Sequence, residues 1–230
     1  FDILELYNTS IPTSMASLVF FMFLLAFAIK APLFPFHTWL PDTYTDAPVS
    51  ATILLSAVMA KLGVYGMIRF IIPIFPIQFH QYSSLLMTLA VIGGIYAGLI
   101  AIVQKDMKRL IAYSSISHLG YIVLGVFALN IQSLQGSVFQ MVNHALSTGA
   151  LFLLVGFLEE RIKTRLIDKT GGLMKIMPPF GILFMLAMFS SIGLPGLNGF
   201  VGEILIFLGV FGTNPLIATI ATTGVVIGAV

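Results

Sequence analysis

The sequence contains no cysteine, and only 9% of its 230 residues are charged. The lack of cysteine excludes disulfides, thiolate-held iron–sulfur clusters and thiolate zinc sites within this chain. A soluble domain carries about 25% charged residues, so the low charge argues against a water-soluble fold. No basic stripe interleaved with aromatics is present, and we expect no nucleic-acid partner. With 58% hydrophobic residues, the composition predicts a protein that uses the lipid bilayer as its solvent.

Apolar runs long enough to span a bilayer, which takes about 20 residues, recur along the whole chain. Six lie at about 14–36, 49–70, 84–103, 108–128, 136–158 and 177–212, and a seventh starts near Pro215. The sixth run is too long for one straight span and is interrupted near Pro195. We therefore predict an all-α polytopic membrane protein with about seven transmembrane helices, in which residues 1–230 form a single membrane domain.

The basic residues predict how these helices are oriented. Two connections that lie two spans apart hold eight of the eleven basic residues: Lys105, Lys108, Arg109, Arg161, Lys163, Arg165, Lys169 and Lys175. The connection at 37–48 belongs to the same side. Connections on the opposite side, at about 71–83, 129–135 and 212–215, have no Lys or Arg. Because cytoplasmic loops carry an excess of basic residues, we expect the basic side to face the cytoplasm or the matrix.

Five ionisable residues interrupt the apolar runs: Lys30, Lys61, His118, His144 and Glu203. A charge at the centre of a membrane helix costs about 2.5–3.5 kcal/mol on insertion scales, so such residues usually face a protein interior or water. Each also has a structural interpretation. Lys30 can extend its amine toward the membrane surface, Lys61 and Glu203 can form buried salt bridges, and a neutral histidine can bond to a carbonyl.

Together, the five residues favour a file of groups that pass protons. Burial in a low-dielectric interior disfavours the charged form of an ionisable group, so such groups can gain and lose a proton near neutral pH. The sequence has no serine–histidine–carboxylate arrangement that would suggest nucleophilic catalysis, and no glycine-rich phosphate loop. We therefore predict a proton relay, with no metal among these residues.

Two of the helices are predicted to be broken, each beside a charge. Pro32 follows Lys30 closely, and Pro195 and Gly196 come shortly before Glu203. Proline inside a helix removes a backbone hydrogen bond and clashes with the preceding turn. Broken helices at membrane depth mark ion sites in transporters built from inverted repeats. A simple kink is the alternative, but it does not explain why each break adjoins a charge.

The two broken segments also resemble each other in sequence. Four residues match at one constant offset, namely Phe21, Met22, Ile29 and Pro32 with Phe184, Met185, Ile192 and Pro195. The segments are the first and the sixth spans. An odd separation of five spans gives them opposite orientations, as inverted repeats require.

Several motifs resemble those of the antiporter-like subunits of respiratory complex I and of Mrp-type cation/proton antiporters. They are KAPLFPFHTWLPD at 30–42, DAP at 46–48, KLGVYG at 61–66, DMKRLIAYSSISHLG at 106–120, NHA at 143–145 and GLPGLNGFVGE at 193–203. The similarity covers essentially the whole chain. Within the family, Glu203 is typical of the complex I subunit that has glutamate on its second broken helix, where its sister subunits have lysine.

This resemblance implies a fourteen-helix inverted-repeat fold, of which the chain covers the part from just before helix seven to within helix thirteen. We therefore expect an internal part of a longer subunit, with the N-terminal half absent. Lys30 would be the central lysine of the first broken helix, and it would pair with a glutamate on helix five, outside this sequence. Lys61, His118 and His144 would connect Lys30 to Glu203, the last group of the relay.

The resemblance further implies proton translocation coupled to electron transfer from NADH to quinone. FMN, iron–sulfur clusters and quinone are expected in other subunits, with no cofactor in this chain. Expected partners are the other membrane subunits, including sister antiporter-like subunits, together with lipids and protons. The expected location is the bacterial cytoplasmic membrane or the mitochondrial inner membrane.

Three functional alternatives remain at this point. The chain can belong to an Mrp-type cation/proton antiporter, to a membrane-bound hydrogenase, or to a scaffold with an inactive channel. The His118-Leu119-Gly120 form of its motif favours complex I over the first two. The charges at Lys30, Lys61 and Glu203 argue against a scaffold, because an inactive channel has no reason to keep residues that are costly to insert.

Overall fold

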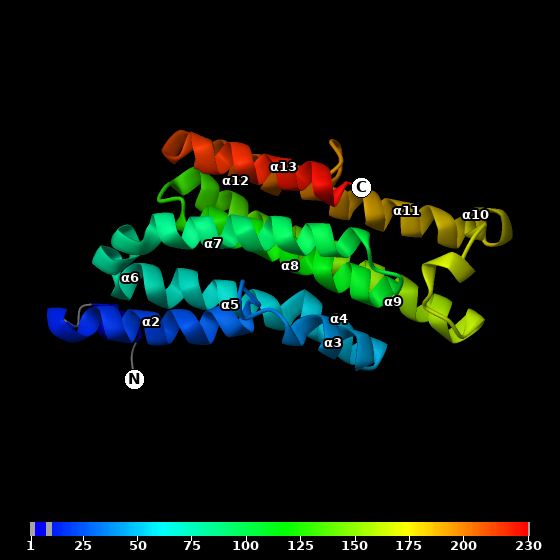
Figure 1. Ribbon diagram of the computed structural model, residues 1–230, viewed down its shortest axis with the longest axis horizontal. Coiled ribbons are helices and arrows are strands. Elements are labelled where there is room, and N and C mark those ends of the chain that lie inside the picture. Colours follow the sequence, from blue (N-terminus) through cyan, green and yellow to red (C-terminus); the bar gives the residue numbers. More distant parts are fainter. Residues whose placement is uncertain (1–2, 8–10, 230) are drawn as a thin grey trace.

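The computed structural model describes residues 3–7 and 11–229. All regular secondary structure elements in that part of the chain are helices (Figure 1). In chain order the elements are α1 (Ile3–Tyr7), α2 (Thr13–Lys30), α3 (Trp39–Asp46), α4 (Val49–Leu54), η1 (Leu55–Met59), α5 (Ala60–Gly66), η2 (Met67–Ile71), α6 (Ile72–Ile74), α7 (Pro76–Ile102), α8 (Met107–Phe127), α9 (Ile131–Ile162), η3 (Ile167–Lys169), α10 (Leu173–Ile176), α11 (Pro178–Ile192), α12 (Asn198–Thr213) and α13 (Pro215–Gly228). Elements η1 and η2 are π-helical, and they join α4, α5 and α6 into one helix from Val49 to Ile74.

Four helices in the described part are long and apolar enough to cross a membrane: Val49–Ile74, α7, α8 and α9. A fifth candidate is the pair formed by Ile167–Ile176 and α11, which is bent by 120°. Helices α2, α12 and α13 are also apolar, but they are shorter. The polytopic helical fold predicted from the apolar runs is confirmed.

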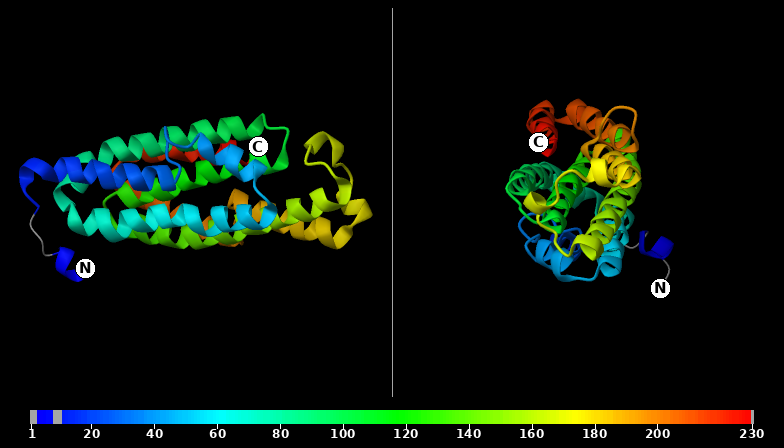
Figure 2. Two further views of the ribbon diagram at one scale, coloured as in Figure 1. Left: turned by 90° about the horizontal axis from the view of Figure 1, so that it is seen from below. Right: turned by 90° about the vertical axis from the view of Figure 1, so that its right-hand side faces the viewer.

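The long helices lie side by side and form an elongated bundle (Figures 1 and 2). Helix α2 and the helix from Val49 to Ile74 form one side of the bundle, and α11, α12 and α13 form the other. Helices α7, α8 and α9 lie between them (Figure 2, right). This central group therefore contacts both broken segments and can connect them.

The two basic connections meet at one end of the bundle. The backbone N–H of Met107 donates to the carbonyl of Arg165 at 3.1 Å, and that of Ile167 donates to the carbonyl of Lys105 at 3.0 Å. Arg165 also forms an ion pair with Asp106, with 3.0 Å between its Nε and a carboxylate oxygen. The basic residues assigned to one side from sequence alone do lie together.

The first broken segment differs in its details from the sequence prediction. The apolar run at 14–36 was predicted as one span, but α2 ends at Lys30. The chain turns over residues 31–38, where Pro32 and Pro35 have no N–H to continue the helical ladder. The stretch at 37–48, predicted as a connection, contains the short helix α3. Helices therefore flank the break on both sides, α2 before it and α3 after it, as they do in the second broken segment.

The second broken segment is interrupted by glycines in the left-handed region. Gly193 ends α11 with a φ of 77°, and Gly196 has a φ of 96° before α12 begins. Such angles cost a residue with a Cβ about 1–2 kcal/mol, which explains the glycines. Helices α2 and α11 run in opposite directions along the bundle (Figure 1). The opposite orientation predicted from the internal similarity is confirmed.

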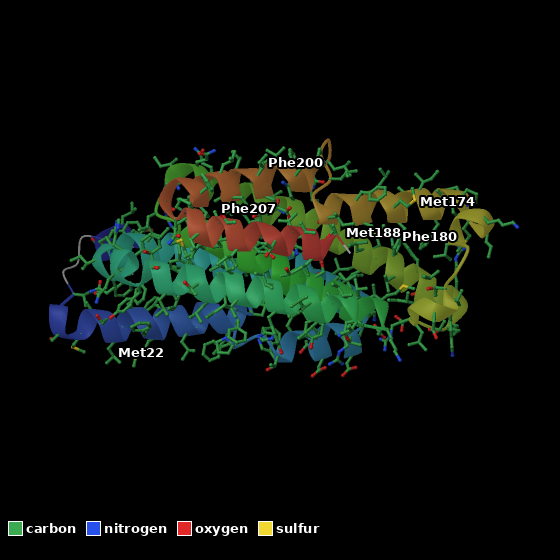
Figure 3. The ribbon with its side chains drawn as sticks, turned by 45° about the horizontal axis from the view of Figure 1, so that its top comes forward. Met22, Met174, Phe180, Met188, Phe200 and Phe207 are labelled. Carbon is green, nitrogen blue, oxygen red and sulfur yellow. The ribbon has the colours of Figure 1, made fainter. Side chains whose placement is uncertain are left out.

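Large apolar side chains occur both inside the bundle and on its outer surface. Phe20, Phe75 and Phe127 are buried together in one cluster, and Tyr44 and Phe152 are buried in another. Outward-facing side chains include Met22 at the edge of α2 (Figure 3), which is 60% exposed. An apolar outer surface is suited to contact with lipid tails.

Candidate functional site

Four of the five predicted relay residues are buried in the bundle. Lys61 lies on α5 with 8% of its surface exposed, and its Nζ donates a hydrogen bond to the carbonyl of Ser56. That carbonyl lies in the π-helical segment η1. Lys61 is also close enough to His144 on α9 for the two to interact electrostatically. The buried amine is thus bonded within its own helix, at the π-helical segment.

The two histidines form the middle of the site. The ring centroids of His118 on α8 and His144 on α9 are 5.3 Å apart, with an angle of 53° between the ring planes. Thr148, one turn further along α9, places its hydroxyl oxygen 3.3 Å from the His144 ring nitrogens. Both histidines are buried. Adjacent imidazoles of this kind can pass a proton from one ring to the next.

Glu203 completes the group on α12. One of its carboxylate oxygens, Oε1, lies 3.1 Å from Nδ1 of His118 and 3.2 Å from Nε2 of Gln140. The other oxygen lies against Gly193, where an added Cβ would come within 2.5 Å of it. The sequence left open a buried salt bridge for Glu203, and Arg69 is the cation at the end of a nearby apolar run. The partner of Glu203 is instead His118, while Arg69 is exposed and lies over the ring of Tyr7.

Lys30 is not part of this buried group. It is exposed at the end of α2, and within residues 3–7 and 11–229 it takes part in no side-chain hydrogen bond or ion pair. The neighbouring backbone does approach α5, because an added Cβ on Gly63 would lie 2.7 Å from the nitrogen of Ala31. Lys30 is therefore near the level of Lys61 but on the surface. A shared path between the two lysines stays a prediction.

Several polar residues of the site were given no role by the sequence analysis. Helix α9 presents one buried polar face, made of Gln140, Asn143, His144, Ser147 and Thr148. Their spacing of three and four residues is that of one side of an α-helix. Asn143 donates to the carbonyl of Asn198 at 2.7 Å and so fixes the start of α12. Polar residues at helical spacing in an otherwise apolar run were the signal that could have identified this face.

A cavity of about 490 Å³ adjoins the carboxylate end of the group. His118 and Glu203 line it, and so do the hydroxyl groups of Ser117 and Tyr121. It extends to Thr170, in the basic connection after α9. The sequence predicted Glu203 as the last group of the relay, and that role stays a prediction.

No group of three or more His, Asp or Glu side chains that could hold a metal ion occurs among the described residues. What these side chains can do is hold and transfer protons. Lys61, His144, His118 and Glu203 follow one another across the bundle from α5 to α12, through α9 and α8. Three different helices hold the acid, the two imidazoles and their amide neighbour in place.

Comparison with known proteins agrees with this architecture. A family model described as NADH:quinone oxidoreductase/Mrp antiporter, TM, matches residues 1–228. The chain belongs to this family of membrane subunits. It is similar to NADH-quinone oxidoreductase subunit M of Rhodobacter capsulatus, with 44% identity over 213 residues, which is 93% of this chain and 42% of the relative. The chain thus spans less than half the length of that relative.

Solved structures give the same result. A chain of respiratory complex I from Thermus thermophilus with bound NADH matches with a TM-score of 0.95 and 37% identity, over 100% of this chain and 49% of the other. A chain of the Mrp complex from Dietzia sp. DQ12-45-1b matches with a TM-score of 0.92 and 25% identity, over 99% and 42%. The family resemblance stated from the motifs is confirmed.

Proposed function

We propose that the chain is the part of a NADH-quinone oxidoreductase membrane subunit that carries protons through a buried file. The observation that supports this most directly is the close placement of His144, His118 and Glu203, with the buried Lys61 on a neighbouring helix. A series of titratable groups in a low-dielectric interior can be loaded and emptied one proton at a time. Lys30 is the proposed entry to the series, as the family resemblance implies.

Electron transfer belongs to other subunits in this proposal. FMN, the iron–sulfur clusters and quinone are bound there, and this chain has no redox centre. Its partners are the other membrane subunits, including the sister antiporter-like subunits, and the surrounding lipid. The complex lies in a bacterial cytoplasmic membrane or in the mitochondrial inner membrane. Glu203 receives protons from His118 and releases them to the side opposite the basic connections.

Replacing Glu203 by glutamine tests the proposal. Glutamine keeps the shape and can still accept the hydrogen bond from Gln140, but it cannot titrate at physiological pH. We expect an assembled complex that still oxidises NADH but translocates protons much less well. The measurement is the proton-to-electron ratio in proteoliposomes. A normal ratio in a well-assembled Glu203→Gln complex would remove Glu203 from the route and favour a purely structural ion pair with His118.

An Mrp-type antiporter subunit is the second candidate, because a chain of an Mrp complex has nearly the same fold. Membrane-bound hydrogenase subunits lie between the two classes. Purification of the complex that contains this chain separates them. Flavin and iron–sulfur subunits would co-purify with a complex I subunit, whereas only membrane antiporter subunits would co-purify with an Mrp subunit.

A further inference from the structure

The side chain of Gln140 lies at the centre of the contact between α9 and α12. It is buried, with 3% of its surface exposed, and its Nε2–H donates to Oε1 of Glu203 at 3.2 Å. The same oxygen lies 3.1 Å from Nδ1 of His118. Two nitrogen groups from two helices therefore converge on one carboxylate oxygen. This arrangement keeps the acid beside the imidazole that would deliver its proton.

The other end of the amide has no partner. Oε1 of Gln140 is buried and has no hydrogen-bond partner in the described part of the chain. It lies against Gly202 of α12, where an added Cβ would overlap this oxygen. A buried acceptor without a donor is costly, and an apolar side chain at position 140 would avoid that cost. The amide is therefore poorly explained by packing alone.

The two protonation states of Glu203 explain why both ends of an amide are useful here. An ionised carboxylate can only accept hydrogen bonds, whereas a protonated carboxyl also has one O–H to donate. In the orientation seen, the Gln140 amide donates to the ionised form. If the amide turns by 180° about its terminal bond, its Oε1 faces Glu203 and can accept from the protonated form. Because Gly202 has no Cβ, this end of the amide packs directly against the backbone of α12.

We infer that Gln140 is a positioning residue that bonds to Glu203 in both protonation states by turning its amide. When a proton moves from His118 to Glu203, the N–H bond of the imidazolium breaks and an O–H bond forms. The imidazole and the carboxyl are then both neutral, and the carboxyl bonds to the turned amide. Loss of the proton restores the first arrangement. This inference rests on the proposed function, because it assigns Gln140 a role in the proton route through Glu203.

Replacing Gln140 by methionine tests the inference. Methionine keeps the length of the side chain and removes both polar ends, including the unpartnered oxygen, so the complex should still assemble. We expect roughly a tenfold fall in proton translocation, from the loss of a hydrogen bond to a charged group. Ser83→Ala is the control. Ser83 is also buried, but it lies on α7 outside the site, and its hydroxyl donates to the carbonyl of His80 in its own helix. This control should behave like the wild type.

An infrared measurement separates positioning from a general packing defect. The carboxyl band that disappears in Glu203→Gln identifies Glu203 in difference spectra of the whole complex. This band should shift in Gln140→Met and stay unchanged in Ser83→Ala. Should Gln140→Met fail to assemble, Gln140→Leu offers a second apolar replacement for the same spectra. A normal proton-to-electron ratio, or an unmoved carboxyl band, in the assembled variant would overturn the inference. If Glu203→Gln itself pumps normally, the proposed function fails instead.

Discussion

The two broken helices contain similar sequences, yet their charges lie in very different surroundings. At the second break, Glu203 is buried, contacts His118 and Gln140, and lies against Gly193. At the first break, Lys30 is exposed, and the backbone next to it is held by a side chain from beyond the break. The indole of Trp39 donates to the carbonyl of Ile29 at 3.2 Å, which compensates one of the backbone acceptors freed where α2 ends.

Beyond the first break, α3 is fastened at its far end by cations. Arg165 donates to the carbonyl of Thr45 at 2.8 Å. Lys108 approaches the carbonyl of Ala47 at 3.5 Å and pairs with Glu159 at 3.2 Å. Cations at the carbonyl end of a helix are favourable because of the helix dipole. The comparison teaches that similar breaks can hold their charges differently: Glu203 is contacted by side chains of this chain, whereas Lys30 has no side-chain hydrogen bond or ion pair within residues 3–7 and 11–229.

The largest expected effect follows from removing the exposed charge. If both breaks belong to one proton route, Lys30→Ala should lower coupled pumping at least about tenfold, which is a change of about 1.4 kcal/mol in the barrier. Assembly should survive, because no partner in the described residues is left unpaired. Proton-to-electron ratios in proteoliposomes measure this, with the exposed Lys175→Ala as the control. Wild-type pumping by the assembled Lys30 variant would make the first break a purely structural feature.

A smaller effect is expected from the glycines of the second break. Gly193→Ala and Gly196→Ala both place a Cβ in the left-handed region, at a cost of about 1–2 kcal/mol in stability. Only at Gly193 would the new Cβ reach Glu203, since nothing lies within 4 Å of a Cβ at Gly196. Both variants should lose similar thermal stability, but Gly193→Ala should lose several times more pumping. Equal pumping by the two would mean that this side of the carboxylate is unimportant.

Replacing the histidines should have a milder effect than replacing Lys30. Water can bridge the gap left by a neutral imidazole, so His118→Ala and His144→Ala should each reduce pumping by less than about tenfold. Measurements on the same proteoliposomes allow direct comparison with Lys30→Ala. Complete loss of pumping from either histidine change, in a normally assembled complex, would contradict this ranking and make the imidazoles indispensable.

The smallest effects concern stability at the basic end. Lys108 is buried beside Glu159, which is 33% exposed and also lies 3.7 Å from Arg165. We expect Lys108→Met to lower the free energy of unfolding by about 1–2 kcal/mol, less than the loss of a fully buried pair because Arg165 remains. Arg109→Ala breaks an exposed pair with Asp42 and should cost under about 1 kcal/mol. Thermal unfolding of the solubilised complex measures both, and the reverse ranking would contradict the burial argument.

Much of the fold could be predicted from apolar runs and prolines, because a membrane span needs a fixed length and few polar residues. Element ends were less predictable. Helix α9 runs from Ile131 to Ile162, longer than the predicted 136–158. Asn130 accepts a hydrogen bond from the N–H of Ser133 and caps its start, and Lys163 ends it with a φ of 57°. These local bonds add turns that hydrophobicity does not indicate.

The types of residue in the candidate site could be predicted, but the directions in which their side chains point could not. A buried charge in an apolar run is visible in the sequence, which identified Lys61 and Glu203. The sequence does not say which way a residue faces, and Lys30 points away from the helices that hold the other four residues although its run is equally apolar. Gln140 was overlooked because a neutral amide is not conspicuous in a sequence. Its importance comes from the neighbouring helix, which brings Glu203 and Gly202 against it.

The paired connections at the basic end limit how the two histidine helices can move. The segment before α8 and the segment after α9 are joined by two backbone hydrogen bonds. One links Met107 to Arg165, and the other links Ile167 to Lys105. Sliding α8 along α9 by a single residue, or about 1.5 Å, would break both bonds. These hydrogen bonds thereby help to keep His118 on α8 level with His144 on α9. A conformational change that slides these two helices past each other would therefore first have to open this paired backbone.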